Sequence, residues 1–72
     1  MTRIPNAEEM ETLEALVDHT SLFEVVVALS VVCGDKAGHI RANYQDNKTA
    51  AAWDRAGKVI ITAAKKDTIQ TL

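Results

Sequence analysis

The chain has 72 residues, enough for one small domain but too few for a large enclosed active-site cleft. Its 47% hydrophobic content argues against disorder, and one proline and three glycines are too few for a turn-rich β-sandwich. The net charge is −2, with acidic side chains concentrated in residues 1–24 and basic ones dispersed over residues 25–72. This dispersal argues against a nucleic-acid site.

Three features indicate a cytoplasmic protein that does not enter a membrane. The single cysteine excludes an internal disulfide and favours a reducing compartment. Residues 1–14 are polar and acidic, unlike a signal peptide. The longest apolar run, Val25 to Cys33, is much shorter than the roughly 20 residues that a membrane span needs.

The first predicted helix runs from Asn6 to Asp18, after a short tail at residues 1–5. Asn6 and Glu9 have the spacing of a capping box, in which each side chain bonds a backbone N–H at the helix start. The apolar face of this helix consists of Met10, Leu13, Leu16 and Val17. A helix this short needs support from other parts of a structure.

Three acidic residues, Glu11, Glu14 and Asp18, share one side of this first helix because they are spaced three and four apart. Like charges placed in this way repel one another slightly. They form either a solvated face or an acidic stripe that contacts a basic surface on another protein or mimics nucleic-acid phosphates. We include them among the candidate partner-binding residues.

The central helix is predicted from Ser21 to Gln45, with Ser21 and Glu24 as a second capping box. Its apolar stripe contains Leu22, Val26, Leu29, Cys33, Ala37, Ile40 and Tyr44. The valines between residues 25 and 32 leave a buried strand as an alternative, because β-branched residues favour strands. Continuation of the stripe to residue 44 favours the helix.

The third helix is predicted from Asn47 to Lys66, with Asp46 or Asn47 as its cap, followed by a C-terminal tail at residues 67–72. Its alanines and Gly57 give it small side chains, so it can approach another helix closely. Gly34 and Gly38 lie four apart in the central helix and offer a matching surface. The predicted oligomer seam consists of Leu22, Val26, Leu29, Gly34 and Gly38.

No motif indicates catalysis, a cofactor or a metal ion. Cys33, Asp35, His39 and His19 lack the paired spacing of a structural zinc site. We expect Cys33 to be a buried, unreactive thiol, and Asp35 and His39 to form a surface pair.

The most distinctive cluster surrounds the second turn and contains Arg41, Tyr44, Trp53 and Arg55. Tyrosine, tryptophan and arginine are enriched at binding hot spots, so this end of the molecule is a candidate partner surface. Alternatively, the two aromatic residues close the open end of the core, and the arginines pair with Asp46 and Asp54.

The sequence therefore predicts one all-α domain over residues 1–72. We expect a small bundle of two to three antiparallel helices with a long central helix, completed by homodimerisation. The expected function is a non-enzymatic protein-binding module, an inhibitor or adaptor of a larger complex. Phage-encoded inhibitors such as anti-CRISPR proteins offer an analogy of size and charge alone. The alternatives are a structural subunit of a larger assembly and a nucleic-acid-binding helical protein.

Overall fold

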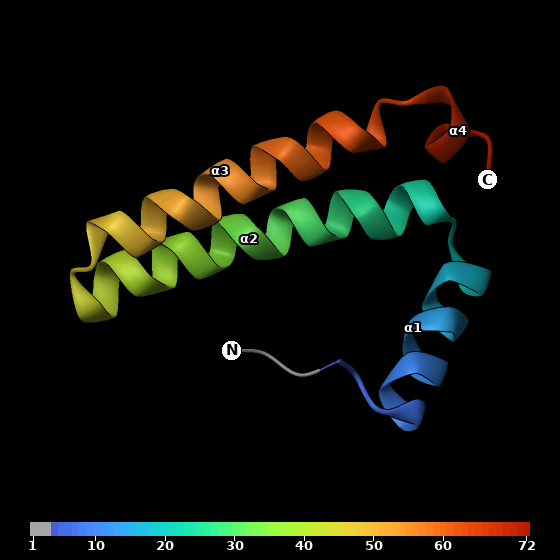
Figure 1. Ribbon diagram of the computed structural model, residues 1–72, viewed down its shortest axis with the longest axis horizontal. Coiled ribbons are helices and arrows are strands. Elements are labelled where there is room, and N and C mark those ends of the chain that lie inside the picture. Colours follow the sequence, from blue (N-terminus) through green and yellow to red (C-terminus); the bar gives the residue numbers. More distant parts are fainter. Residues whose placement is uncertain (1–3) are drawn as a thin grey trace.

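The computed structural model describes residues 4–72, and in that range the protein is all-α, without strands. Its elements are α1 (Ala7–His19), α2 (Leu22–Tyr44), α3 (Asn47–Ala64) and the single-turn α4 (Asp67–Gln70) (Figure 1). The predicted all-α class is confirmed, as is the helical interpretation of Val25 to Cys33. Of the expected N-terminal tail, residues 1–3 lie outside the described residues.

Each long helix begins at a predicted capping residue, which for α3 is Asp46 and not the alternative Asn47. The Asn6 side chain accepts the Glu9 backbone N–H at 2.8 Å, and the Glu9 carboxylate accepts the Asn6 N–H at 2.9 Å. Ser21 accepts the Glu24 N–H at 3.0 Å, and its hydroxyl donates to the Glu24 carboxylate at 3.3 Å. Asp46 accepts a backbone N–H from the first turn of α3 at 3.0 Å. Because N-cap bonds are local, the sequence spacing was sufficient to find them. The capping box at Asn6 and Glu9 is confirmed, whereas the second is incomplete, since the Glu24 carboxylate accepts from the Ser21 hydroxyl and not from its backbone N–H.

Helices α2 and α3 run side by side in opposite directions and form a hairpin (Figure 1). The two helices approach each other closely at the buried Gly57, where an added Cβ would lie 3.2 Å from the Ser30 carbonyl oxygen and 3.3 Å from the Cys33 Cβ. A Cβ at Gly34 or Gly38 would meet nothing within 4 Å. The prediction that Gly34 and Gly38 provide the surface for close approach of the third helix is therefore wrong, and Gly57 has that role.

The hairpin core is built from small side chains: Val25, Cys33, Ala37, Ala50 and Ala64. Two members of the predicted α2 stripe are outside this core, because Leu29 is 46% exposed and Tyr44 is 71% exposed. The first half of α2 is apolar around most of its circumference, so periodicity alone does not select the face that packs against α3.

Helix α1 turns away from the hairpin, at an angle of 119° to α2 (Figure 1). It ends where the Thr20 hydroxyl and backbone N–H both donate to the Leu16 carbonyl oxygen, at 2.8 and 3.1 Å. Its contacts are with α2 and not with α3, and none of its residues is buried. The chain therefore presents α1 as an arm with little support from its own core.

The segment predicted as a C-terminal tail begins with α4, which contacts both α2 and α3. Ile69 is half-buried there, while Leu72 is 68% exposed. A single half-buried side chain holds this turn to the end of the hairpin.

Candidate protein-binding surfaces

The first candidate surface is the row of apolar side chains on α1 made by Met10, Leu13, Leu16 and Val17, here called the α1 stripe. Met10 is 48% exposed, Leu13 41% and Leu16 48%, whereas Val17 is half-buried. The spacing of three and four residues places them on one side of the helix. Large apolar side chains aligned in this way and exposed to water are typical of a surface that another molecule covers.

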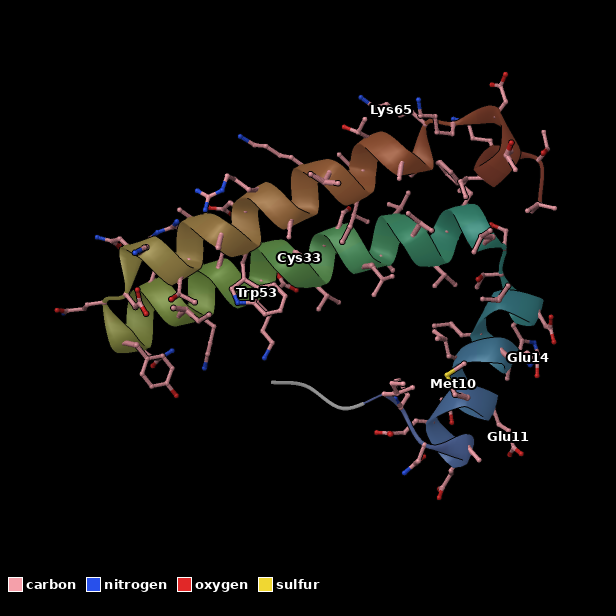
Figure 2. The ribbon with its side chains drawn as sticks, viewed as in Figure 1. Met10, Glu11, Glu14, Cys33, Trp53 and Lys65 are labelled. Atoms are coloured by element: carbon pink, nitrogen blue, oxygen red, sulfur yellow. The ribbon has the colours of Figure 1, made fainter. Side chains whose placement is uncertain are left out.

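The three acidic residues predicted as partner contacts lie beside the α1 stripe. Glu11, Glu14 and Asp18 are all exposed. A shallow depression on α1 is lined by the stripe residues Met10, Leu13 and Val17 and by the two glutamates. Figure 2 shows Glu11 and Glu14 extending from the outer side of α1. The surface thus combines an apolar strip with a negative edge, and its complement is an apolar groove with a positive rim.

The second candidate surface is the end of the hairpin where α2 turns into α3. Arg41 and Asp54 form an ion pair across the two helices, with Nη2 donating to Oδ2 at 3.0 Å. Trp53 is half-buried and extends from α3 towards α2, where the Lys36 amino group lies 6.0 Å from its ring centroid (Figure 2). These interactions connect the two helices of the hairpin, so Arg41 and Trp53 are already engaged within the chain.

The other two residues of this cluster, Tyr44 and Arg55, are exposed and take no part in the contacts described above between α2 and α3. Tyr44 is 71% exposed and does not close the core, and its ring contacts that of His39 edge-on at a centroid distance of 6.3 Å. Arg55 is exposed on α3. Asn43 donates to the His39 carbonyl oxygen at 2.9 Å and lies 3.1 Å from His39 Nδ1. His39 was expected to pair with Asp35, but in the structure it contacts Asn43 and Tyr44 instead.

The residues of the predicted oligomer seam fall into two groups. Leu22 and Val26 are half-buried within the chain, whereas Leu29, Gly34 and Gly38 are exposed. The seam therefore does not form one continuous exposed face.

A groove that the sequence did not indicate runs between α2 and α3. It is lined by Ser30, Gly34, Asp54, Gly57, Lys58 and Ile61, and we call it the hairpin groove. Gly34 leaves its α2 side open, since no atom lies within 4 Å of the position of a Cβ there. The only sequence signal for this groove is the small size of three of its lining residues, Ser30, Gly34 and Gly57. That signal can be recognised only once the pairing of α2 with α3 is known.

The remaining candidates for chemistry are separate from one another. Cys33 is buried in the hairpin, as expected. Over residues 4–72 no three histidine, cysteine, aspartate or glutamate side chains gather closely enough to hold a metal ion. In the same range no single helix is both long and apolar enough to cross a membrane; α1 and α2 together reach that length and composition, but with the 119° bend between them.

The chain matches no protein-family model, and neither a curated protein nor a solved structure is significantly similar to it. What it binds must therefore be inferred from the chemistry of its own surfaces.

Proposed function

We propose that this chain is a small, non-enzymatic protein-binding module that docks its α1 arm on a partner protein. The observation that carries the proposal is that α1 has no buried residue and exposes three large apolar side chains, Met10, Leu13 and Leu16, beside an acidic edge. The partner has an apolar groove with basic residues along one rim. In the cell, such a module acts as an inhibitor or adaptor of a larger cytoplasmic complex.

The energetics of α1 support this role. A free helix of 13 residues is marginally stable in water, and most helical stability in proteins comes from packing of an apolar face. The Asn6–Glu9 capping box organises the start of α1 but adds only about 1 kcal/mol. Docking on a partner would bury the stripe and supply the missing packing, at roughly 25 cal/mol for each Å² of apolar surface removed from water.

The acidic edge contributes mainly to the choice and orientation of the partner. Exposed ion pairs contribute about 0.2 to 1 kcal/mol each, less than the burial of one large apolar side chain. Complementary charges nevertheless accelerate association and penalise partners of the wrong charge. We therefore assign affinity to the α1 stripe and selectivity to Glu11, Glu14 and Asp18.

The hairpin end has a secondary place in this proposal. Tyr44 and Arg55 are exposed and of the residue types common at hot spots, but Arg41 and Trp53 already interact with Asp54 and Lys36. Binding there would compete with contacts that connect α2 to α3. The α1 stripe has no such competition.

The test is affinity capture from host lysate with three baits: the native chain, a stripe variant and a matched control. The stripe variant Leu13→Glu/Leu16→Glu changes exposed residues of α1, and the control Val32→Glu/Val59→Glu makes the same kind of change at exposed positions of α2 and α3. We expect one dominant protein to be captured by the native chain and the control and lost from the stripe variant. Equal recovery with the stripe variant would refute α1 as the docking element.

A salt series on the captured complex separates protein binding from phosphate binding. A complex held by apolar burial changes little between low and high salt, whereas nucleic-acid binding weakens steeply. Capture that disappears with salt and nuclease treatment would instead favour the alternative of a nucleic-acid-binding protein.

A further inference from the structure

The hairpin groove has the features that the α1 stripe requires of a partner. Its α2 side is open at Gly34, and its α3 side presents the apolar Ile61 next to Lys58. Val31, three residues before Gly34, is 57% exposed and extends the apolar surface along α2. An apolar ridge from another helix fits such a groove because, among residues 4–72, nothing lies within 4 Å of the Cβ position at Gly34.

Two lysines lie along the α3 side of this groove with a defined spacing. Lys58 lines the groove, as does Asp54, whose carboxylate is already paired with Arg41. Lys65 lies beyond the lining residues, seven residues after Lys58 at the C-cap of α3, with helical backbone angles. Seven residues are almost two helical turns, so the two lysines point the same way, about 10 Å apart along the axis. Both are exposed.

The acidic edge of α1 has the same spacing. Glu11 and Asp18 are also seven residues apart, so they too share one side of their helix with about 10 Å between them. The two pairs of opposite charge do not meet within one chain, because α1 makes no contact with α3. Figure 2 shows Lys65 at the far side of the hairpin from Glu11 and Glu14.

We propose that the partner covering the α1 stripe is a second copy of this chain. The α1 arm of each copy lies in the hairpin groove of the other, with the stripe against Gly34 and Ile61 and the acidic edge against the two lysines. This inference rests on the proposed function, since it names the occupant of the same surface: the protein on which α1 docks is a second copy of the chain, and the dimer contacts a larger complex through surfaces other than α1. The exchange is reciprocal, so it closes as a two-fold symmetric dimer and leaves no α1 stripe exposed.

A second copy is favoured over an unrelated protein by this matched spacing and by chain length. A 72-residue chain buries only about 60% of its unfolded surface and commonly completes its core by association. Each dimer contains the α1–groove contact twice, so every favourable or unfavourable substitution counts twice in its free energy. The hairpin end with Tyr44 and Arg55 remains outside this interface.

The test is the molar mass in solution, measured by light scattering coupled to size exclusion, for the native chain and two charge-reversed variants. The first variant is Glu11→Lys/Asp18→Lys, and the second is Lys58→Glu/Lys65→Glu. We expect the native chain at twice its 7.8 kDa mass, and each variant alone as a monomer, with a dimer dissociation constant raised by about tenfold or more. An equimolar mixture of the two variants should regain the dimer mass. In the mixed dimer the reversed arm of the first variant meets the reversed groove of the second, and the native arm of the second meets the native groove of the first.

Two controls separate a specific contact from general effects of charge or folding. Glu8→Lys/Asp35→Lys changes the net charge as much as the first variant but at exposed positions away from the stripe, and should remain dimeric. Gly34→Leu adds a side chain into open space, so the hairpin should keep its helical circular dichroism while the blocked groove yields a monomer. A charge-reversed variant whose circular dichroism is no longer helical has unfolded and does not report on the interface. In that case the molar mass of Gly34→Leu decides whether the groove is the dimer contact.

The outcomes also distinguish this inference from the proposed function. A native chain that stays at 7.8 kDa up to millimolar concentration overturns the dimer, whereas loss of lysate capture by the stripe variant would still uphold binding through α1. A dimer that survives both charge reversals and Gly34→Leu overturns the α1–groove arrangement. Failure of the variant mixture to dimerise overturns the pairing of the acidic edge with the two lysines.

Discussion

The close approach of α2 and α3 at Gly57 gives the sharpest prediction about stability, because Gly57 and Gly38 are both helical glycines in opposite surroundings. Replacing glycine by alanine inside a helix stabilises it by about 1 kcal/mol. At Gly38 the added methyl group meets nothing within 4 Å, so Gly38→Ala should realise that gain. At Gly57 the methyl group would lie 3.2 Å from the Ser30 carbonyl oxygen and 3.3 Å from the Cys33 Cβ.

The Gly57 methyl group must therefore separate α2 from α3 by a few tenths of an ångström. Overpacking of this kind costs about 1 to 3 kcal/mol, which exceeds the gain in helix propensity. We expect Gly57→Ala to be destabilised by about 1 kcal/mol and to unfold about 2 kcal/mol more easily than Gly38→Ala. In a chain of this length that difference corresponds to roughly 10 °C in melting temperature.

The assay is thermal and urea unfolding followed by circular dichroism at 222 nm, with all proteins at one concentration because self-association shifts apparent stability. Gly38→Ala is the matched control. If Gly57→Ala is as stable as Gly38→Ala, the two helices do not meet at Gly57 and the described packing of the hairpin is incorrect.

Three further predictions concern other parts of the chain. Val25→Asp should destabilise the fold by about 3 kcal/mol or more because Val25 is buried, whereas Leu29→Asp, at a 46% exposed position, should cost under about 1 kcal/mol; equal losses in urea unfolding would contradict the core assignment. Hydrogen bonds from the Thr49 backbone and side chain hold the pKa of Asp46 below its ordinary value of 3.8, so its contribution to stability is present above that pH and is lost as the pH falls through the lowered pKa. Asp46→Asn should flatten this acid limb in unfolding curves measured from pH 2 to 6, and an unchanged limb would contradict the assignment. The buried Cys33 thiol should react slowly with Ellman's reagent in native protein and rapidly in urea, while fast reaction of the native protein would show that the hairpin opens.

Local sequence signals predicted where the helices begin. Asn6, Ser21 and Asp46 each bond a backbone N–H within three residues, so their spacing is sufficient to identify them. The helical interpretation of residues 25–33 succeeded for a related reason, because the apolar pattern continues beyond Gly34 for three further turns.

Features that depend on contacts between helices were not predictable in the same way. Helix α2 is apolar on most sides, so the sequence did not reveal that Val25 is buried and Leu29 is not. All three glycines occur in helices, yet only the pairing of α2 with α3 singles out Gly57 as the point of close approach. The 119° turn between α1 and α2 arises within the short segment at Thr20 and Ser21, whose composition carries no clear signal for that angle.

The same contrast holds for the candidate surfaces: those on one helix could be predicted from the sequence, and those formed between helices could not. The exposure of Glu11, Glu14 and Asp18 follows from their spacing on one helix, and the structure places them beside the α1 stripe. The hairpin groove, by contrast, is made by two helices and was missed. The predicted cluster at the second turn proved to be three sets of contacts, Arg41 with Asp54, Trp53 with Lys36 and His39 with Tyr44, and of the cluster residues Tyr44 is 71% exposed.

The most direct measurement is hydrogen–deuterium exchange of the native chain at a low and a high protein concentration. If α1 docks in the hairpin groove of a second copy, its backbone amides should exchange rapidly in dilute protein and become protected in concentrated protein, together with the groove segments around Gly34 and Ile61. The turn at Gln45 should exchange equally at both concentrations. Protection of α1 that is already complete in dilute protein would contradict this role, because the chain's own core would then be holding the helix.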